Sequence, residues 1–482
     1  MGFVNSRTIA GGLLAVLATA ILVYFGTGLH PWWPLLWFAP LPVLLFATRS
    51  SWSSAAVCGF LGWSLGALNL QHYFRAVLGA PPVTLAVIIC IPSLVFAVGV
   101  LLFRGLVKRG APWSAVLALP SLYTSFEYLV SLSSPHGTAG SLAYSQLNFL
   151  PFLQLASLTG PSGMTFLLLL FSSGLAVALS LRRDAQRRAL KIVAVSTGLL
   201  VLVLAFGFIR LSRSASGPMA KVGLIASDEP QYRDVVHEGE ATERLLRDYA
   251  SHAETLASNG AQVIVLPEKL GVIVESNKET ADAIMQSVAD KTNAMLIVGV
   301  VDVSPPVSYN QARIYAPGTA VRTYDKHHML PPFESQFKPG TALTLVRQPS
   351  ALWGVTICKD MDFTPLSRTY GQSGAALLLV PAWDFKLDRW SHGHMAVMRA
   401  VEDGFSIARA ARQGYLTATD NRGRILAEVQ SDSSQFATLL VDVPAAHDTT
   451  LYLMWGDWFA WLSMGILGLT CLRLFSSRAL AH

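Results

Sequence analysis

Long runs of apolar residues dominate the first half of the chain, and one further run lies near its end. About twenty consecutive apolar residues are enough for a helix to cross a bilayer. Ala18-Thr19-Ala20 is similar to a signal-peptide cleavage site, but the first run continues beyond it, which favours an uncleaved span. The pattern predicts eight membrane-spanning helices, at residues 8–28, 32–48, 53–71, 82–106, 113–131, 160–181, 190–211 and 457–475.

Basic residues gather on one face of this predicted bundle. With the N-terminus inside the cell, the clusters after the second, fourth, sixth and eighth spans all lie inside, as the positive-inside rule requires. The segment at 214–450 then lies outside, in the periplasm or its equivalent. The loop at 132–158 shares that face and carries no Lys or Arg. It either packs as a re-entrant segment or borders an opening for substrate.

Residues 218–446 change to short, alternating elements. Buried strands are indicated by KVGLIA, AQVIVLPE, AMLIVGVVD, ALWGVTIC and AALLLVPAW, which are rich in β-branched residues and end at turn residues. Helical patterns at 238–259, 277–292 and 390–404 alternate with them, and LTATDNRGRILAEVQ predicts a hairpin that turns at Asn421-Arg422-Gly423. The expected fold is a single α/β domain, large enough for its own core.

Composition supports a membrane protein and excludes other classes. The chain is 52% hydrophobic and 14% charged, with a net charge of +6. The loops between spans account for the basic excess, and no basic stripe or zinc pattern points to nucleic acid. His327-His328 and His392-x-His394 have no Cys or acidic residue at a familiar ligand spacing. We therefore expect no metal and interpret these histidines as structural or as polar surface.

Three polar residues lie where predicted strands end. Glu268 closes VIVLPE, Lys326 closes VRTYDK and Cys358 closes WGVTIC. In open α/β sheets, ligands bind beyond the carboxyl ends of strands. A strand-end cysteine is often inert core, and surface Glu and Lys are common. However, the other three cysteines lie in apolar spans, so Cys358 has no disulfide partner in its domain. A free thiol outside the cell is either buried or used.

Glu, Lys and Cys in this order resemble the carbon–nitrogen hydrolase (nitrilase) superfamily. LPEK, YDKHHMLPPFE and ICKD match its three motifs, and RAVEDGFSIARAARQG is similar to its helix and following strand. The spans, together with AYSQLNFLPFLQLASLTGPSG and TLYLMWGDW, resemble the membrane-bound apolipoprotein N-acyltransferase family. The resemblance implies a nitrilase-like α-β-β-α sandwich at 218–446. It would lie between a seven-helix membrane domain at 1–213 and a final helix with a short cytoplasmic tail at 450–482.

The resemblance also implies an activity. It points to an enzyme of the bacterial inner membrane with its catalytic domain on the periplasmic side, without metal or cofactor, and we expect a monomer. A membrane phospholipid would be the acyl donor, and an apolipoprotein with an N-terminal diacylglyceryl-cysteine the acceptor. Cys358 would form a thioester, Glu268 would act as the base and Lys326 would stabilise the oxyanion. Glu334 would orient Lys326 or the incoming amine.

The sequence departs from the family pattern around the expected nucleophile. Lys359-Asp360 stand where Tyr-Glu is usual, PPFE lacks the glycine of PFGE, and VPAWDF keeps Trp383 but no Asn. Because these positions line the substrate side, we expect Lys359, Asp360 and Trp383 to contact substrate. Tyr144 in the outer loop and Phe333 in MLPPFESQF, which forms either an apolar lid or a plain packed loop, complete the predicted set.

Two other functions stay open from the sequence. The departures fit a membrane amidase, or an N-acyltransferase with a different amine acceptor. A degenerate, non-catalytic module that binds lipid or a partner is the other alternative. Retention of Glu, Lys and Cys argues against it, because a binding module has no need of a thiolate.

Overall fold

The computed structural model describes residues 6–181, 185–215, 217–229 and 239–476. Position 238, where the first helix of the α/β region was predicted to begin, lies outside these ranges. The chain divides into two compact units. The membrane unit comprises Met1–Leu132, Gly140–Arg210 and Trp455–His482, and the α/β unit comprises Ser133–Ala139 and Leu211–Met454.

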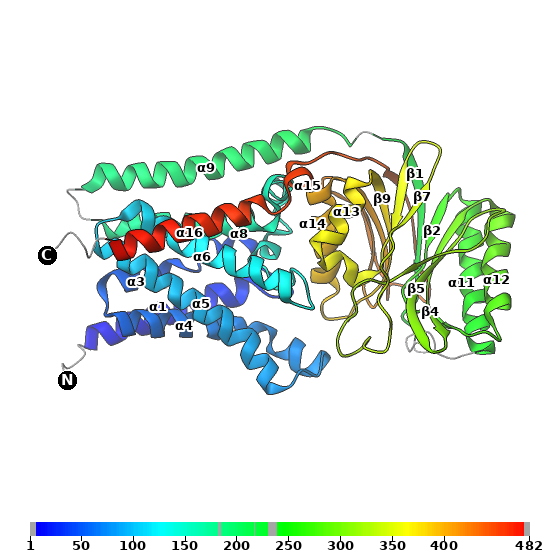
Figure 1. Ribbon diagram of the computed structural model, residues 1–482, viewed down its shortest axis with the longest axis horizontal. Helices are drawn as coiled ribbons and strands as arrows, with labels where there is room; N and C mark the ends of the chain where they lie inside the picture. The colour runs from blue at the N-terminus through cyan, green and yellow to red at the C-terminus, as the bar shows by residue number, and fades with distance from the viewer. Residues whose placement is uncertain (1–5, 182–184, 216, 230–238, 477–482) are drawn as a thin grey trace. The chain divides into compact units, whose positions relative to one another are not determined.

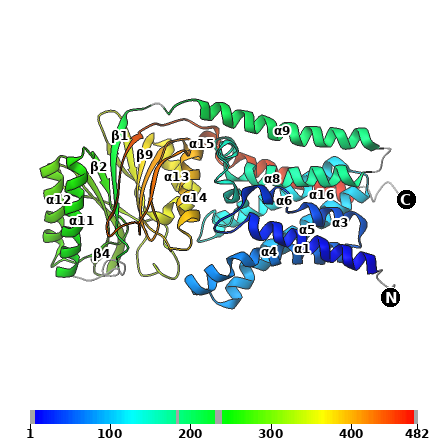
Figure 2. The ribbon, with the colours of Figure 1, turned by 180° about the vertical axis from the view of Figure 1, so that it is seen from behind.

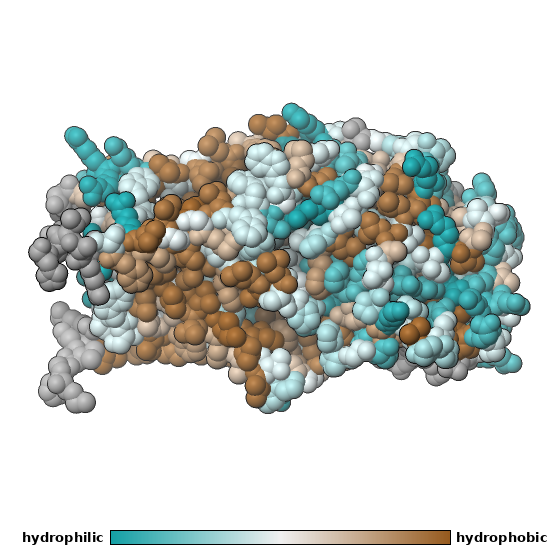
Figure 3. Space-filling view, viewed as in Figure 1, coloured by the Kyte–Doolittle hydropathy of each residue, from teal (hydrophilic) through white to brown (hydrophobic). Residues whose placement is uncertain are grey.

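The membrane unit is helical. Within the described residues, seven helices are long and apolar enough to cross a membrane. They are α1 (Ser6–Gly26), α4 (Trp52–Gly66, extended by η1, Ala67–Leu70), α5 (Pro82–Lys108), α6 (Pro112–Ser133), α8 (Ala156–Ser180), α9 (Gln186–Ser212) and α16 (Trp458–Ser476). Hydrophobic residues cover much of this unit's surface in Figure 3, and large apolar side chains such as Leu14, Val83 and Leu202 are exposed. These side chains are suited to contact lipid.

The second predicted span, 32–48, is apolar but broken. It forms α2 (Trp33–Leu36) and α3 (Leu41–Arg49), and each has a proline at its first or second position. Proline lacks a backbone N–H and clashes with the preceding turn, so it begins a helix readily but does not continue one. With this shorter segment the count is close to the eight predicted. The remaining short helices are η2 (Tyr73–Val77), η3 (Leu142–Gln146), α7 (Leu150–Leu153) and α15 (Leu451–Trp455).

The α/β unit contains two sheets. In the described residues, one has seven strands in the order β13-β1-β2-β4-β5-β6, with β3 beside β4, and the other has six in the order β12-β11-β10-β9-β8-β7. The strands of the first sheet are β1 (Met219–Ala226), β2 (Val263–Val265), β3 (Val272–Ile273), β4 (Met295–Ser304), β5 (Val307–Tyr315), β6 (Arg322–Asp325) and β13 (Ala437–Pro444). Those of the second are β7 (Thr344–Arg347), β8 (Leu352–Val355), β9 (Ala375–Trp383), β10 (Ser406–Arg412), β11 (Tyr415–Thr419) and β12 (Ile425–Gln430).

Helices cover the outer face of each sheet, which gives the expected α-β-β-α sandwich. Helices α11 (Glu240–Ser258) and α12 (Lys278–Thr292) lie against the first sheet, and α13 (Thr364–Gln372) and α14 (Arg389–Asp403) against the second (Figures 1 and 2). The predicted helices and the β11–β12 hairpin are confirmed, whereas α13 was not predicted. Apolar side chains from facing strands, such as Leu224, Val265 and Leu378, fill the space between the sheets.

Candidate active site

The backbone brings Glu268 to the junction of the two sheets. Glu268 follows β2, and its N–H donates to the carbonyl of Ala382 in β9 at 3.2 Å. Gly299 of β4 allows this close approach. A Cβ at Gly299 would lie 2.4 Å from the carbonyl oxygen of Pro267 and 2.5 Å from the Cα of Glu268. A glycine is therefore needed beside this carboxylate.

Two carboxylates hold the Lys326 ammonium. Its Nζ lies 2.8 Å from Glu268 Oε1 and 2.7 Å from Glu334 Oε2. Asn310 Nδ2 donates to the same Glu268 oxygen at 2.6 Å, and Lys269 Nζ lies 2.6 Å from Glu334 Oε1. We name these five residues the carboxylate–lysine cluster. The expected juxtaposition of Glu268, Lys326 and Glu334 is thus present, and Asn310 and Lys269 are additional members.

Electrostatics fix the protonation of two members of this cluster. Burial disfavours the Lys326 ammonium, but Glu268 and Glu334 outweigh that cost and hold the pKa of Lys326 well above its ordinary value. Burial opposes the Glu334 carboxylate as well, yet Lys326 and Lys269 hold its pKa well below the ordinary value. Lys326 is therefore a fixed cation at neutral pH and is unsuited to act as the base.

Cys358 begins η5 (Cys358–Asp362), the turn that follows β8. Its φ of 45° lies in the left-handed region, which residues with a side chain seldom adopt. The thiol is buried and donates to the carbonyl of Trp383 at 3.4 Å. In the described part of the chain, no hydrogen bond joins it to Glu268 or Lys326. The thiol therefore keeps its proton in this contact, because it is the hydrogen-bond donor.

The charges around Cys358 favour the neutral thiol at rest. Burial raises the pKa of the thiol and so does Glu268, whereas Lys326 and Arg409 lower it; the net shift is well upward. Reaction therefore requires removal of the proton by a neighbouring base. Glu268 is suited to this task because the transfer removes the same negative charge that disfavours the thiolate.

The two residues after Cys358 are buried. Asp360 accepts from the Tyr324 hydroxyl at 2.7 Å and from the N–H groups of His327 at 3.1 Å and His328 at 2.9 Å, which joins η5 to the loop after Lys326. Lys359 Nζ lies 3.2 Å from Asp362 Oδ2. The predicted contact of Lys359 and Asp360 with substrate stays a prediction.

The other predicted substrate residues differ in their surroundings. The ring of Trp383 lies under two cations, with Lys269 Nζ 5.0 Å and Arg412 Cζ 3.8 Å from its centre. Phe333 is 45% exposed and contacts the ring of Phe385, which suits a lid. Tyr144 belongs to the membrane unit, where it is buried in η3. The roles of these residues also stay predictions.

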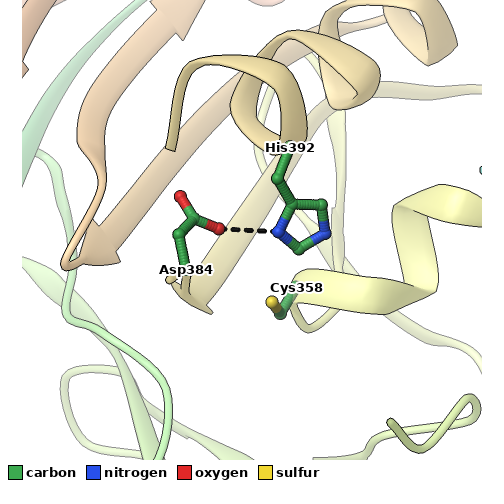
Figure 4. A group of neighbouring side chains, drawn as sticks. All are labelled: Cys358, Asp384 and His392. Atoms are coloured by element: carbon green, nitrogen blue, oxygen red, sulfur yellow. Dashed lines mark hydrogen bonds and ion pairs between the residues drawn. The ribbon is translucent and has the colours of Figure 1, made fainter. Parts of the chain in front are cut away.

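Sequence reasoning missed a second group beside the thiol. Side-chain donor atoms of Cys358, Asp384 and His392 lie within 4.8 Å of one another, as Figure 4 shows. His392 does therefore have a cysteine and an acidic residue as neighbours, contrary to our interpretation of its sequence spacing. Seven residues lie between Asp384 and His392, and α13 and β9 separate both from Cys358, so no short motif signals the group.

Comparisons with known proteins agree with this architecture. Residues 236–449 match the carbon–nitrogen hydrolase family model, and residues 11–174 match that of the apolipoprotein N-acyltransferase N-terminal domain. A four-layer hydrolase domain joined to apolar helices defines a membrane-bound carbon–nitrogen hydrolase. With both of these models on one chain, the protein belongs to the apolipoprotein N-acyltransferase family.

Individual relatives cover most of the chain. It is 25% identical to an apolipoprotein N-acyltransferase of Geobacter metallireducens over 98% of this chain and 96% of that protein. It is 27% identical to one of Haemophilus ducreyi, over 74% and 75% respectively. Among solved structures, an amidase from Nesterenkonia sp. is similar, with a TM-score of 0.41 and 20% identity over 50% of this chain and 95% of the amidase.

Proposed function

We propose that this protein is a membrane-bound N-acyltransferase that acylates the α-amino group of the N-terminal diacylglyceryl-cysteine of apolipoproteins. The acyl chain would come from a membrane phospholipid by way of a thioester on Cys358. The family membership and the names of its relatives support this function. The observation that carries it is the buried Lys326 ammonium between Glu268 and Glu334, beside a thiol whose pKa Glu268 and Lys326 both affect.

In the first half-reaction, the Glu268 carboxylate takes the proton of the Cys358 thiol, and the thiolate attacks the carbonyl carbon of the phospholipid ester. The ammonium of Lys326 stabilises the tetrahedral oxyanion; one donor of this kind is typically worth about 3 kcal/mol. The intermediate collapses with cleavage of the carbon–oxygen ester bond. The leaving oxygen takes the proton from Glu268, so a lysophospholipid departs and a thioester remains.

In the second half-reaction, the α-amine of the acceptor attacks the thioester carbonyl. Glu268 takes a proton from the attacking nitrogen, the carbon–sulfur bond breaks, and the proton returns to the Cys358 sulfur. An amide is formed and the thiol is restored. The conversion of a thioester to an amide is downhill, so these steps need no co-reactant.

The other members of the carboxylate–lysine cluster would act by positioning. Glu334 and Asn310 hold Lys326 and Glu268 in place through the contacts described above. Because Lys326 is held as a cation, it supplies charge throughout the cycle and leaves proton transfer to Glu268.

Both substrates are anchored in a membrane, which accounts for the joining of a hydrolase-like unit to spanning helices. We further propose the bacterial inner membrane, with the α/β unit on the periplasmic side. The distribution of basic loop residues supports this orientation. We propose a monomer, because the proposed mechanism draws every reacting group from one chain.

The first test asks for the covalent intermediate. Detergent-solubilised protein is incubated with phospholipid, and the intact mass is measured together with the mass of the Cys358 peptide. One fatty acyl mass is expected on Cys358, and none in C358A. C471A is the control, since Cys471 lies in α16 of the membrane unit. Absence of an adduct on the wild-type protein under all lipid compositions would contradict the mechanism.

The second test identifies the acceptor. A synthetic diacylated lipopeptide with a free α-amine is added to the acylated enzyme, and loss of the adduct is followed with formation of the triacylated peptide. An N-acetylated lipopeptide is the matched control and is expected to leave the adduct intact. Discharge only by water or by an unrelated amine would instead support the amidase or alternative-acceptor function.

A further inference from the structure

A row of alternating charges runs behind the Cys358 thiol. Lys359 pairs with Asp362 at 3.2 Å, Asp362 Oδ1 lies 3.4 Å from His392 Nε2, and Asp384 Oδ1 lies 2.7 Å from His392 Nδ1. Arg409 contacts both oxygens of Asp384, through Nη1 at 2.8 Å and through Nη2. We name these five residues the imidazole chain. It contains three cationic side chains and two carboxylates.

The imidazole in the middle of the chain is protonated. His392 Nδ1 hydrogen-bonds to Asp384 at 2.7 Å and Nε2 lies 3.4 Å from Asp362, so each ring nitrogen faces a carboxylate, which favours the imidazolium. Burial opposes that charge, but Asp362 and Asp384 outweigh it and raise the pKa of His392 to about 10. His392 therefore carries a positive charge at neutral pH.

This cation lies beside the thiol. Donor atoms of His392 and Cys358 are within 4.8 Å, and the Cys358 sulfur points toward Asp384 and His392 in Figure 4. The charged and titratable groups that face His392 come from η5, the end of β9, β10, α14 and the segment 133–139. They are Asp362 and Cys358 directly, Lys359 with His136 behind Asp362, Asp384 directly, and Arg409 and Asp388 behind Asp384.

A metal site does not fit this group. A protonated imidazole has no lone pair for a metal, and Arg409 occupies both oxygens of Asp384. A purely structural link does not account for the position of the charge next to the sulfur. When Glu268 takes the thiol proton, one negative charge beside the sulfur is neutralised while another forms on it. The new thiolate is then opposed by burial and by the Asp384 carboxylate, so nearby cations are needed to stabilise it.

We propose that His392 is a positioning residue whose imidazolium, fixed between Asp362 and Asp384, stabilises the Cys358 thiolate during acyl transfer. Its charge would add to that of Lys326 and Arg409, the two cations that lower the pKa of the thiol. The inference rests on the proposed role of Cys358 as the nucleophile. The two carboxylates keep the proton on the ring, so that His392 supplies charge and does not compete with Glu268 as a base.

The test measures the thiolate directly. The full-length, detergent-solubilised protein is treated with iodoacetamide from pH 6 to 9, where His392 keeps its charge, and the alkylation rate of the Cys358 peptide is followed by mass spectrometry. Below the midpoint of the rate–pH profile, the logarithm of the rate rises linearly with pH, so a displacement of this line along the pH axis measures the shift of the midpoint. An opposite charge within about 4–6 Å lowers a pKa by about 1–3 units. In H392Q we therefore expect the midpoint of the rate–pH profile to move upward by at least about one unit, and in H392K to stay near the wild-type value.

A matched control lies two residues away on α14. His394 hydrogen-bonds to the carbonyl of Trp390 at 2.8 Å, and burial lowers its pKa to about 4, so it is neutral. H394Q should leave the midpoint unchanged. An unchanged midpoint in H392Q, or an equal shift in H394Q, would overturn the proposal.

H392N carries the test if H392Q does not fold. Its side chain is neutral and leaves both carboxylates in place, so the alkylation midpoint is expected to rise as in H392Q. No shift in folded H392N would contradict the proposal. Alkylation needs neither donor nor acceptor, so the two proposals fail separately. A shifted profile without acyl transfer refutes only the proposed function, and acyl transfer with an unshifted H392Q profile refutes only this inference.

Discussion

The two buried groups of charges that flank Cys358 contain similar side chains in different arrangements. In the carboxylate–lysine cluster, two carboxylates hold two ammonium groups, and Asn310 donates to both carboxylates. In the imidazole chain, each carboxylate lies between two cations, and cations stand at both ends. The formal charges of the first group cancel, whereas those of the second sum to one positive charge.

This difference suggests a division of tasks. In the proposed mechanism, Glu268 is the member of the first cluster that exchanges a proton with the thiol. The carboxylates of the imidazole chain are held by cations, which keep the pKa of Asp362 and of Asp384 below the ordinary value despite burial. The carboxylate–lysine cluster would therefore transfer the proton, and the imidazole chain would keep a constant positive charge beside the thiol.

The largest effect is expected from E268Q. The amide keeps the shape of the side chain but accepts no proton, and loss of a general base typically costs about 10²–10⁴-fold in rate. The measurement is the single-turnover rate of thioester formation on Cys358. E254Q is the matched control, because Glu254 forms an exposed pair with Lys291. A rate within a few-fold of wild type in E268Q would mean that another residue is the base. The carboxylate–lysine cluster would then not be the group that transfers the proton.

G299A tests the position of the same carboxylate without changing any charge. The added Cβ would lie 2.4 Å from the Pro267 carbonyl, so the backbone of Glu268 must move. A misplacement of about 1 Å can cost on the order of 10²-fold in rate. In G198A the new Cβ meets nothing within 4 Å, so the acylation rate should be unchanged. Equal rates in the two variants would show that the proton transfer tolerates a displaced Glu268.

The contrast between the two groups also separates what the sequence could predict from what it could not. Glu268, Lys326 and Cys358 each follow a short strand, so alternating elements and strand ends were sufficient to predict that Glu268 and Lys326 meet and that Cys358 lies near enough to feel their charges. The apolar runs likewise predicted the spanning helices. The run at 32–48 was predicted as one span, but prolines divide it into α2 and α3. The apolar pattern did not indicate this division, because hydrophobicity carries no information about missing backbone N–H groups.

The imidazole chain could not be predicted in the same way. His392 lies on an amphipathic helix, where a polar side chain is usually solvated, and its partners come from η5, the end of β9 and β10. Their meeting depends on the packing of α14 against the second sheet. The positive φ of Cys358, which places η5 in this packing, is also invisible in the residue type.

The pH dependence of stability tests the charge on His392. Its pKa is raised to about 10 in the fold, so its stabilising contribution is complete below about pH 6.5 and is lost as the pH rises through about 10. H392Q keeps some hydrogen bonds, and we expect it to lose roughly 2 kcal/mol near pH 6. The loss should shrink toward pH 10. The apparent thermal midpoints of both proteins across this range provide the measurement, and a constant difference would mean that the ring is neutral.

The smallest effect is expected where the imidazole chain meets the segment 133–139. His136 Nδ1 lies 3.2 Å from Lys359 Nζ, and burial and Lys359 lower the pKa of His136, so the neutral ring accepts a hydrogen bond. Thr138 independently donates to the carbonyl of Asp362 and holds the segment in place. H136A should therefore cost only about 1 kcal/mol of stability and leave the thiol titration unchanged. H136Q, which keeps an acceptor, should lose less. If H136A shifted the alkylation midpoint as far as H392Q does, the pKa of the thiol would depend on Lys359 and on the segment 133–139 as well as on His392.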